Sequence, residues 1–557
     1  MLAGMRLPGP ADLAEFCQGV IRTCTNDLER RRAFYSRLTN NYLTGTDGLD
    51  SARHNVLQEV IKESSADLYA DGMARFGVDV DQQYGDDLLD EEEAVGEDAQ
   101  RWWHNSRSGK AMAKAVEWAH VWPAAVLKVF VEPGEGEVLV RMLPNTADLG
   151  LLSPNVPEWE NQEGLVQSFS MDLSSFERRV RHRPYYRELM RTALATAQPP
   201  DGRDAMPAAF RSIILAQWTP NLIGMPSGGA LGQTGVELTM ADPQSREPEV
   251  RLKELWVWDD AMNDYRVVTM MAESALLVDD HGNPLVPKAH PFFPVILDPL
   301  PFSAWSVPVM VGILKMQMMH ESFLEWITHV LGMQFDPPLV ATGVAGMLEE
   351  KLDALRSPGG DFTNPLPQGK VENFAPSMPP DAFPMLSELK QMMGRRVGRP
   401  PAMTGGGDPS RSGDQVIHKA LLSAGATLNR AMAVEGAVEA VATYGARLRH
   451  RINHVPLRNP ADGSEFLLNQ FPEEFVIKVD AHSISPIAQE QNREKIMFLI
   501  KEGAITKEDA IRLLGIPQMD RMARKARRLG RAQAALAKQR MAIEETKAAA
   551  KMESAKK

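Results

Sequence analysis

A glycine-rich loop, GRPPAMTGGGDPSRSGDQVIHKA (398–420), has residue types that could bind phosphate. Loops of this kind that lead into a helix bind anions through backbone N–H groups. A nucleotide-binding P-loop also needs a Lys directly after its last Gly, and then a Ser or Thr for magnesium. Here Gly407 and Gly413 are each followed by Asp, and the first Lys is Lys419. The loop therefore argues against nucleotide binding, but its glycines and arginines could contact a phosphate backbone or simply remain in solvent.

Other arrangements that could catalyse a reaction are incomplete. His320 and Glu321 lack the second His, four residues after the first, that a zinc protease needs, because the next His is His329. No Gly-x-Ser-x-Gly motif occurs, and the two cysteines, Cys17 and Cys24, fall short of the roughly four ligands of a zinc site. We expect them to be ordinary thiols in a reducing compartment. The sequence predicts no enzyme, no metal site and no cofactor.

Length and charge give a second set of expectations. A chain of 557 residues should form about two to four domains. No run of 18 apolar residues and no signal peptide is visible, so we expect no membrane span. Residues 521–557 carry twelve Lys and Arg against three Glu, and because the whole chain carries −12, the rest carries −21. This asymmetry predicts a polyanionic partner at the carboxyl end.

The first half of the chain mixes helical and strand patterns. Helices are expected through 11–77, and the carboxylates of 86–98 should mark the start of a solvated helix rather than a metal site. AAVLKVFVEPGEGEVLVRMLP predicts a strand hairpin. A basic helical segment follows at 172–198, in which Pro184 must kink the helix or start another, because it removes a backbone donor. Turn-rich, β-type segments fill 199–300.

The longest predicted helix spans Ser306 to Phe335, and its formal charges are Lys315, Glu321 and Glu325. A helix that is apolar almost all round must pack on several sides, and neighbouring subunits are natural candidates. The rest of the chain predicts further helices, one strand and a basic terminal helix, at 381–397, 414–453, 473–480 and 483–557.

Taken in order, these elements resemble the portal protein of a tailed bacteriophage. The four segments that carry the resemblance are Ala125–Leu143 with the following NTADLGLL, Asp172–Phe335, VGRPPAMTGGGDPSRSGDQVIHKALL, and SISPIAQEQNREKIMFLIKEGAITKEDAIRLLGIP. They are similar, respectively, to the wing sheet, to the stem–clip–stem arrangement, to the loop that leads into the channel helix, and to the crown of that family.

The resemblance implies an α+β, mainly helical chain of the portal type, assembled as a ring of usually twelve subunits. Its parts would be N-terminal helices and wing (1–171), first stem helix (172–198), β-rich clip (199–304), second stem helix (305–336), wing return (337–397), tunnel loop (398–413), tunnel helix and wing strand (414–480), and crown with a basic C-terminal helix (481–557).

By the same resemblance, the ring would stand at one capsid vertex of the virion, after synthesis in the host cytoplasm, and form the channel for DNA packaging and ejection. Expected partners are other copies of the chain, double-stranded DNA bound without sequence specificity, the terminase large subunit, a head-completion or adaptor protein, and the major capsid and scaffolding proteins, but no membrane. Two alternatives stay open: a DNA-dependent NTPase or nuclease of the packaging machinery, and a monomeric DNA-binding scaffold protein.

The resemblance also implies three sets of site residues. The tunnel loop lining the channel would include Arg399, Thr404, Gly405, Gly406, Gly407, Ser410, Arg411 and Ser412. Subunit packing in the stem would involve Val311, Leu314, Met318, Phe323, Trp326 and Val330. A basic crown tail would carry Arg524, Lys525, Arg527, Arg528 and Arg531.

Overall fold

The structure is a computed structural model that describes residues 10–44, 55–69, 74–80, 89–132, 136–143, 146–183, 185–197, 248–271, 277–335, 339–342, 370–373, 377–399, 425–452, 456–459 and 464–479. These residues mix helix and strand, with helix in the majority, as the sequence predicts. The chain divides into two compact units: unit 1 is Met1–Ser65 with Lys114–Ala433, and unit 2 is Ala66–Ala113 with Val434–Lys557. Three helices contribute residues to both units: α2 (Val56–Leu68), α4 (Ser108–Val121) and α12 (Gly425–Ile452).

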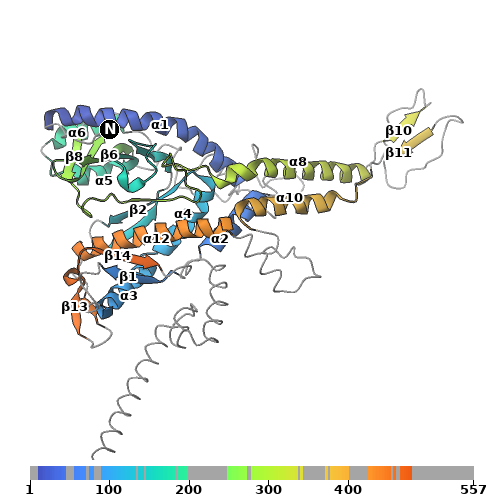
Figure 1. Cartoon of the computed structure of the whole chain (residues 1–557). Coiled ribbons are helices and arrows are strands. Elements are labelled where there is room, and N and C mark those ends of the chain that lie inside the picture. Colours follow the sequence, from blue (N-terminus) through green and yellow to red (C-terminus); the bar gives the residue numbers. More distant parts are fainter. Residues whose placement is uncertain are drawn as a thin grey trace, which may run out of the picture. The chain divides into compact units, whose positions relative to one another are not determined.

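The described part of unit 1 contains a five-stranded and a three-stranded antiparallel sheet, besides the two-stranded pair of β10 (Leu339–Thr342) and β11 (Lys370–Asn373) (Figure 1). The larger has the order β4–β5–β6–β7–β8, with strands Leu149–Leu151, Gly164–Asp172, Glu249–Asp259, Asp264–Met271 and Leu277–Gly282. The smaller has the order β3–β2–β9, with strands Val138–Met142, Ala125–Val131 and Phe292–Val295. The hairpin predicted from the sequence is confirmed, because β2 and β3 pair with each other.

Helix α1 (Pro10–Thr44) covers one face of the larger sheet, packing against side chains such as Leu255 of β6. Cys17 and Cys24 lie in this interface, both fully buried and neither part of a disulfide. Burial raises the pKa of the Cys17 thiol to about 11, so the thiolate form is rare at neutral pH. The two cysteines are therefore small apolar core residues here.

The opposite face of the larger sheet is covered by two different groups of elements. At one end Leu252 packs against α5 (Leu173–Val180) and α6 (Tyr186–Thr196). Further along the same strand, Trp256 points to the same side, as the two-residue period of a strand requires, and packs in the core shared with the smaller sheet.

A polar group separates these two apolar clusters. Glu254 lies on the same face, between Leu252 and Trp256, and its Oε1 is 2.8 Å from Lys128 Nζ, which also donates to Gln167 Oε1 at 2.6 Å. Burial alone would raise the pKa of Glu254, but the charge and hydrogen bond of Lys128 hold it below its ordinary value. This ion pair therefore links β2 of the smaller sheet to β5 and β6 of the larger one.

The structure corrects the expected role of 172–198 and of the β-type segments after it. The helical segment is broken near Pro184 into α5 and α6, as expected, but both helices lie on the larger sheet instead of forming a stem. The strands β6 to β9 belong to the same two sheets as β2 to β5, so they do not form a separate insertion. The prediction assigned segments that are distant in the chain to different parts of the fold. In the structure β5 and β6 are neighbours in one sheet, although 76 residues separate Asp172 from Glu249 in the chain.

Unit 2 is built around a two-stranded antiparallel sheet of β1 (Phe76–Val80) and β14 (Phe475–Val479). Helix α3 (Leu89–Asn105) begins in the acidic run, as predicted, and packs on the described part of α12 that belongs to this unit. A buried ion pair joins them, with Arg449 Nη1 2.6 Å from Asp98 Oδ2. The short strands β12 (Pro456–Arg458) and β13 (Glu465–Leu467) form a second small pair.

Candidate functional site: a helical hairpin and the base of a loop

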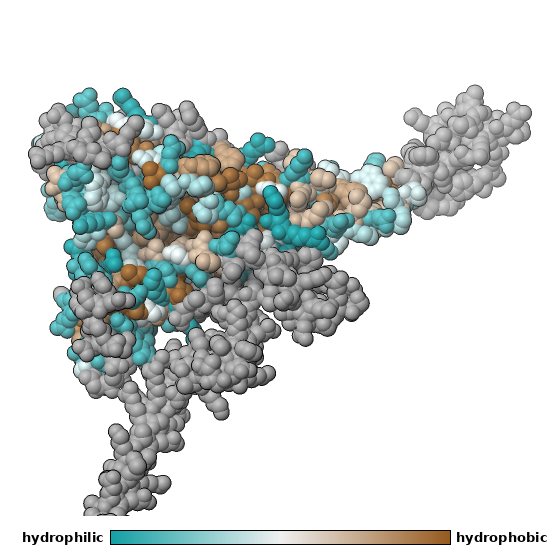
Figure 2. Space-filling model, in the orientation of Figure 1, coloured by the Kyte–Doolittle hydropathy of each residue, from teal (hydrophilic) through white to brown (hydrophobic). Residues whose placement is uncertain are grey.

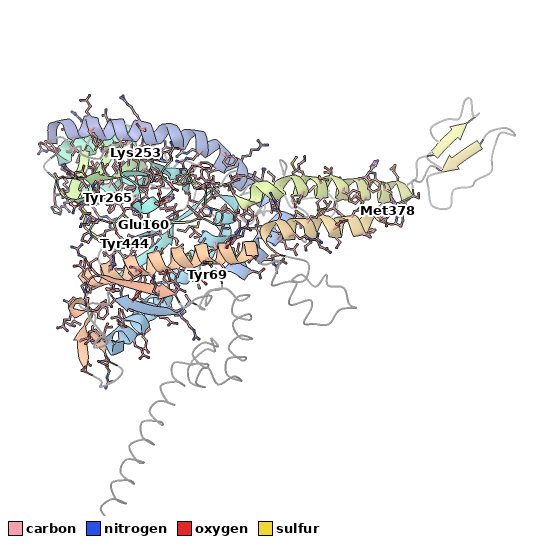
Figure 3. All side chains as sticks on the ribbon, in the orientation of Figure 1. Tyr69, Glu160, Lys253, Tyr265, Met378 and Tyr444 are labelled. Carbon is pink, nitrogen blue, oxygen red and sulfur yellow. The ribbon has the colours of Figure 1, made fainter. Side chains whose placement is uncertain are left out.

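The long apolar helix predicted from the sequence is α8 (Val309–Phe335), and it packs side by side with α10 (Ala382–Val397) as an antiparallel hairpin (Figure 1). Met378, just before α10, lies at the end of the hairpin where α8 finishes (Figure 3). Between them in the chain, β10 (Leu339–Thr342) pairs with β11 (Lys370–Asn373). The helix partner of α8 is therefore α10, and not 172–198 as expected.

The inner side of α8 is used within unit 1. Its buried side chains recur at helical spacing: Met310, Ile313, Gln317, His320, Ile327 and Val330. The fully buried Gln317 accepts a hydrogen bond from the backbone N–H of Leu57 at 3.1 Å, and donates to Glu321 Oε1 at 2.7 Å. The first N–H groups of a helix have no partner within it, so Gln317 stabilises the start of α2 and fixes that helix against α8.

The outer side of α8 is open to solvent in the single chain, and large apolar residues lie there among polar ones such as Lys315, Glu325 and His329. Val311, Met318, Met319 and Trp326 expose 40%, 50%, 54% and 40% of their surfaces. On the face drawn in Figure 2, apolar residues continue from the base of the hairpin along both helices, interrupted by polar ones. Apolar surface is favourable to bury, so this side of the hairpin is suited to contact another apolar surface.

The six residues predicted to pack between subunits divide between these two sides. Val311, Met318 and Trp326 are exposed on the outer side, Leu314 and Phe323 are half-buried, and Val330 is buried on the inner side. The rings of Phe323 and Trp326 stack at 5.4 Å between centroids. The apolar character all round α8 thus has two causes, an internal helix contact on one side and an uncovered face on the other.

The carboxyl end of α10 forms the base of the glycine-rich loop. Gly398 has a φ of 101°, which side-chain-bearing residues rarely adopt, and it ends the helix. Its carbonyl accepts a hydrogen bond from Thr427 Oγ1 at 2.5 Å, and the carbonyl of Val397 accepts one from Arg430 Nη1 at 2.7 Å. Thr427 and Arg430 lie in the first turns of α12, so the residues before and after 400–424 are hydrogen-bonded to each other.

Arg430 also connects this base to the rest of unit 1. Its Nε and Nη2 donate to the two carboxylate oxygens of Asp298 at 2.9 and 2.8 Å, the two-pronged geometry that Arg forms best. Nearby, Ser64 Oγ of α2 donates to the Val397 carbonyl at 3.3 Å and lies 3.1 Å from His120 Nε2. One charged side chain therefore fixes α10, α12 and the segment before α8 together.

His120 of α4 is fully buried beside this junction. Its Nδ1 lies 2.9 Å from the carbonyl of Val116, which can only accept, so Nδ1 carries the proton. Burial lowers the pKa of His120 to about 4, and the positive charge of Arg430 also disfavours a second cation. His120 is therefore neutral at ordinary pH.

Of the predicted tunnel-loop residues, the structure describes Arg399. Its backbone N–H donates to the Gly394 carbonyl at 2.8 Å, and its side chain forms an ion pair with Glu63. The charge expected to meet phosphate is thus already paired within the chain. Thr404, Gly405, Gly406, Gly407, Ser410, Arg411 and Ser412 lie outside the described residues, as does the whole predicted crown tail.

Sequence reasoning missed the side chains that hold the loop base. Thr427, Arg430 and Asp298 belong to no recognisable motif, and Asp298 stands 132 residues from its partner. The sequence offered one weaker signal for this place: a Gly two residues before a Pro, as in Gly398-Arg399-Pro400, is typical of a helix end.

Two kinds of feature are absent from the described ranges. In them, no group of three or more His, Cys, Asp or Glu side chains is arranged to hold a metal ion. No helix in these ranges is long and apolar enough to cross a membrane.

No protein-family model and no curated protein matches the sequence. Among solved structures, the chain is similar to a chain of the virion of a native gene transfer agent (GTA) particle, with a TM-score of 0.39 and 9% sequence identity. The similarity covers 87% of this chain and 93% of that chain. A TM-score of this size does not establish a shared fold.

Proposed function

We propose that the chain is a virion structural protein, a subunit of a ring-shaped portal of the tailed-bacteriophage type, without catalytic activity of its own. In this proposal α8 and α10 form the stem, the segment between them that includes β10 and β11 forms the clip, and 400–424 faces the central channel. This replaces the stem and clip boundaries expected from the sequence. The observation that carries the proposal is the set of large apolar residues exposed on the outer side of α8.

The energetic argument is that this surface is costly in a monomer and useful in a ring. Full burial of one large apolar side chain contributes about 1.5–3 kcal/mol. Val311, Met318, Met319 and Trp326 expose 40–54% of their surfaces, so covering them contributes roughly 1 kcal/mol each. In a closed ring this contribution recurs once at every interface between neighbouring subunits, so modest contacts support a stable assembly.

The loop and the charge distribution suit a channel through which DNA slides. Because the ends of 400–424 are hydrogen-bonded together, the loop starts and ends at one fixed place on each subunit. Outside 521–557 the chain carries −21, and cations are what bind a phosphate backbone tightly. A body of net negative charge would hold DNA weakly enough for movement. Terminase and an adaptor protein would dock on the clip in turn.

The test compares two methionines of equal exposure. Met318 on α8 and Met262 in the β6–β7 turn each expose 50% of their surface. We expect the wild-type chain and Met262→Lys to form rings with a central hole, seen by native mass spectrometry and negative-stain imaging. Met318→Lys places a charge in the proposed contact and should leave monomers or incomplete rings.

Two results would contradict the proposal. One is a wild-type chain that stays a monodisperse monomer. The other is a Met318→Lys variant that forms the same rings as the wild type. DNA-dependent ATP turnover by the purified chain would instead favour the packaging-enzyme alternative.

A further inference from the structure

The solvent side of α5 and α6 carries a cluster of arginines. Each helix buries one side on the larger sheet, with Phe176 and Val180 in α5 and Leu189 and Ala193 in α6. The exposed positions include Arg178, Arg181, Arg187 and Arg191. Between residues 172 and 198 every strong cation is Arg, and none is Lys.

Two further arginines of this segment are used within unit 1 and do not belong to the cluster. Arg183 Nη2 lies 2.6 Å from Asp279 Oδ2, and Arg179 Nη2 donates to Thr269 Oγ1 at 3.3 Å. By contrast, Arg187 and Arg191 have neither a hydrogen bond nor an ion pair to any residue that the structure describes. The surface therefore has an excess of positive charge, with four exposed arginines against the exposed Glu177 and Glu188, in a chain of net charge −12.

The spacing of these cations favours a bound anion. Arg187 and Arg191 are four residues apart on α6, which puts their Cβ atoms about 5–6 Å from each other, and like charges at this spacing destabilise a helix. An anion between them removes that repulsion. The guanidinium group is planar and donates two parallel hydrogen bonds, a geometry that matches a phosphate.

An exposed aromatic residue indicates which anion the surface fits. Tyr185 exposes 68% of its surface and lies in the chain between the Arg178–Arg181 pair and the Arg187–Arg191 pair. Tyrosine hydroxyls, with arginines, are among the usual donors to phosphate oxygens along a nucleic-acid backbone. Exposed arginines on both sides of an exposed tyrosine in the chain therefore have the composition of a backbone contact surface.

We propose that the α5–α6 surface, formed by Arg178, Arg181, Tyr185, Arg187 and Arg191, binds the phosphate backbone of DNA without sequence specificity. The contact lies outside the loop assigned above to a channel, and it does not depend on ring formation. It gives the chain a second place, besides its basic carboxyl-terminal segment, at which DNA is held.

The experiment measures fluorescence anisotropy of a short labelled DNA duplex with the full chain over a series of salt concentrations. The test variant is Arg187→Glu/Arg191→Glu. The matched control is Arg22→Glu/Arg37→Glu, because both control arginines are exposed on α1, which covers the opposite face of the same sheet. Both variants make the same change in net charge, and both keep the basic carboxyl-terminal segment.

We expect the test variant to lose affinity about tenfold or more, and its plot of log affinity against log salt to become shallower by roughly two, since each phosphate contact contributes about 0.9. The control should stay within about twofold of the wild type. Arg187→Lys/Arg191→Lys, which keeps the charge, should retain most of the salt dependence, and it serves as a second test if the Glu variant misfolds.

Three outcomes would overturn the proposal. The first is an equal loss of affinity in the two Glu variants, which would make the effect one of net charge alone. The second is that neither Glu variant changes the affinity for the duplex. The third is that polyglutamate displaces the duplex as well as unlabelled DNA of equal charge does, which would assign the surface to an acidic protein. Ring formation, followed in the same samples, reports separately on the proposed function.

Discussion

Replacing Gly445 of α12 by Ala should destabilise unit 2, because no room exists for a methyl group. An added Cβ would overlap Cη2 of Trp102 on α3 and lie 2.7 Å from its Cζ2. Trp102 exposes 5% of its surface and packs edge to face on Trp103, with ring centroids 6.1 Å apart. The indole therefore cannot move into solvent, and either the ring or the helix must shift.

The size of the effect follows from two opposing contributions. Forcing extra atoms into a packed core costs about 1–3 kcal/mol. Gly to Ala in a helix interior gains about 1 kcal/mol from helix propensity. Because the overlap falls on the rigid end of a buried indole, we take the upper part of the first range and expect a net loss of about 2 kcal/mol.

Gly436 provides the control within the same helix. It is exposed, and a Cβ there would meet no described atom within 4 Å, so Gly436→Ala should stabilise the chain by roughly 0.5–1 kcal/mol. Urea unfolding of the full chain, followed by tryptophan fluorescence and circular dichroism, gives both midpoints. If Gly445→Ala is as stable as the wild type, or if both variants shift in the same direction, Trp102 does not pack on α12 as described.

Three further predictions concern buried ionisable side chains, and the midpoint of urea unfolding measures the effect in each case. The free energy of unfolding should fall by roughly 3 kcal/mol as the pH drops from about 6.5 to about 4, because the unfolded chain binds a proton that buried His120 does not. If the dependence of this free energy on pH is the same in His120→Asn as in the wild type, the prediction is wrong. Arg430→Met should cost about 2–3 kcal/mol, since it leaves the Val397 carbonyl without its charged donor, whereas Asp298→Asn should cost less; equal costs would contradict the described pairing. Lys128→Met should cost about 3–5 kcal/mol of unfolding free energy, because it leaves the charge of Glu254 buried without its cation. A second change, Glu254→Gln, should restore part of this loss. If the losses of the two single variants simply add in the double variant, the two groups do not interact.

Local features of the fold could be predicted from the sequence because they depend on local patterns. The β2–β3 hairpin follows from two apolar runs around a Pro-Gly-Glu-Gly turn, and α8 follows from its long apolar period. The helix break predicted from Pro184 is also found, because α5 ends at Val180 and α6 begins at Tyr186.

The partners of these elements could not be predicted, because pairing depends on contacts between distant parts of the chain. Periodicity identifies the apolar sides of 172–198 and of α8, but not which surface covers each of them. The first proved to cover a sheet, and the second packs on α10. The loop base depends on Asp298 meeting Arg430, a single pair that no spacing rule marks.

The adjacency of β5 and β6 has a consequence for how the protein is made. Asp172 of β5 pairs with Glu249 of β6, so β5 is synthesised 77 residues before the first residue of β6 that pairs with it. At about 5–20 residues per second, this leaves an apolar strand edge unpaired for roughly 4–15 s during synthesis. Distant pairing of this kind also slows folding, because the loop must close before the strands gain any contact. While 173–249 is being synthesised, the unpaired edge of β5 is therefore open to aggregation, and a chaperone that covers this edge in that interval would protect the chain.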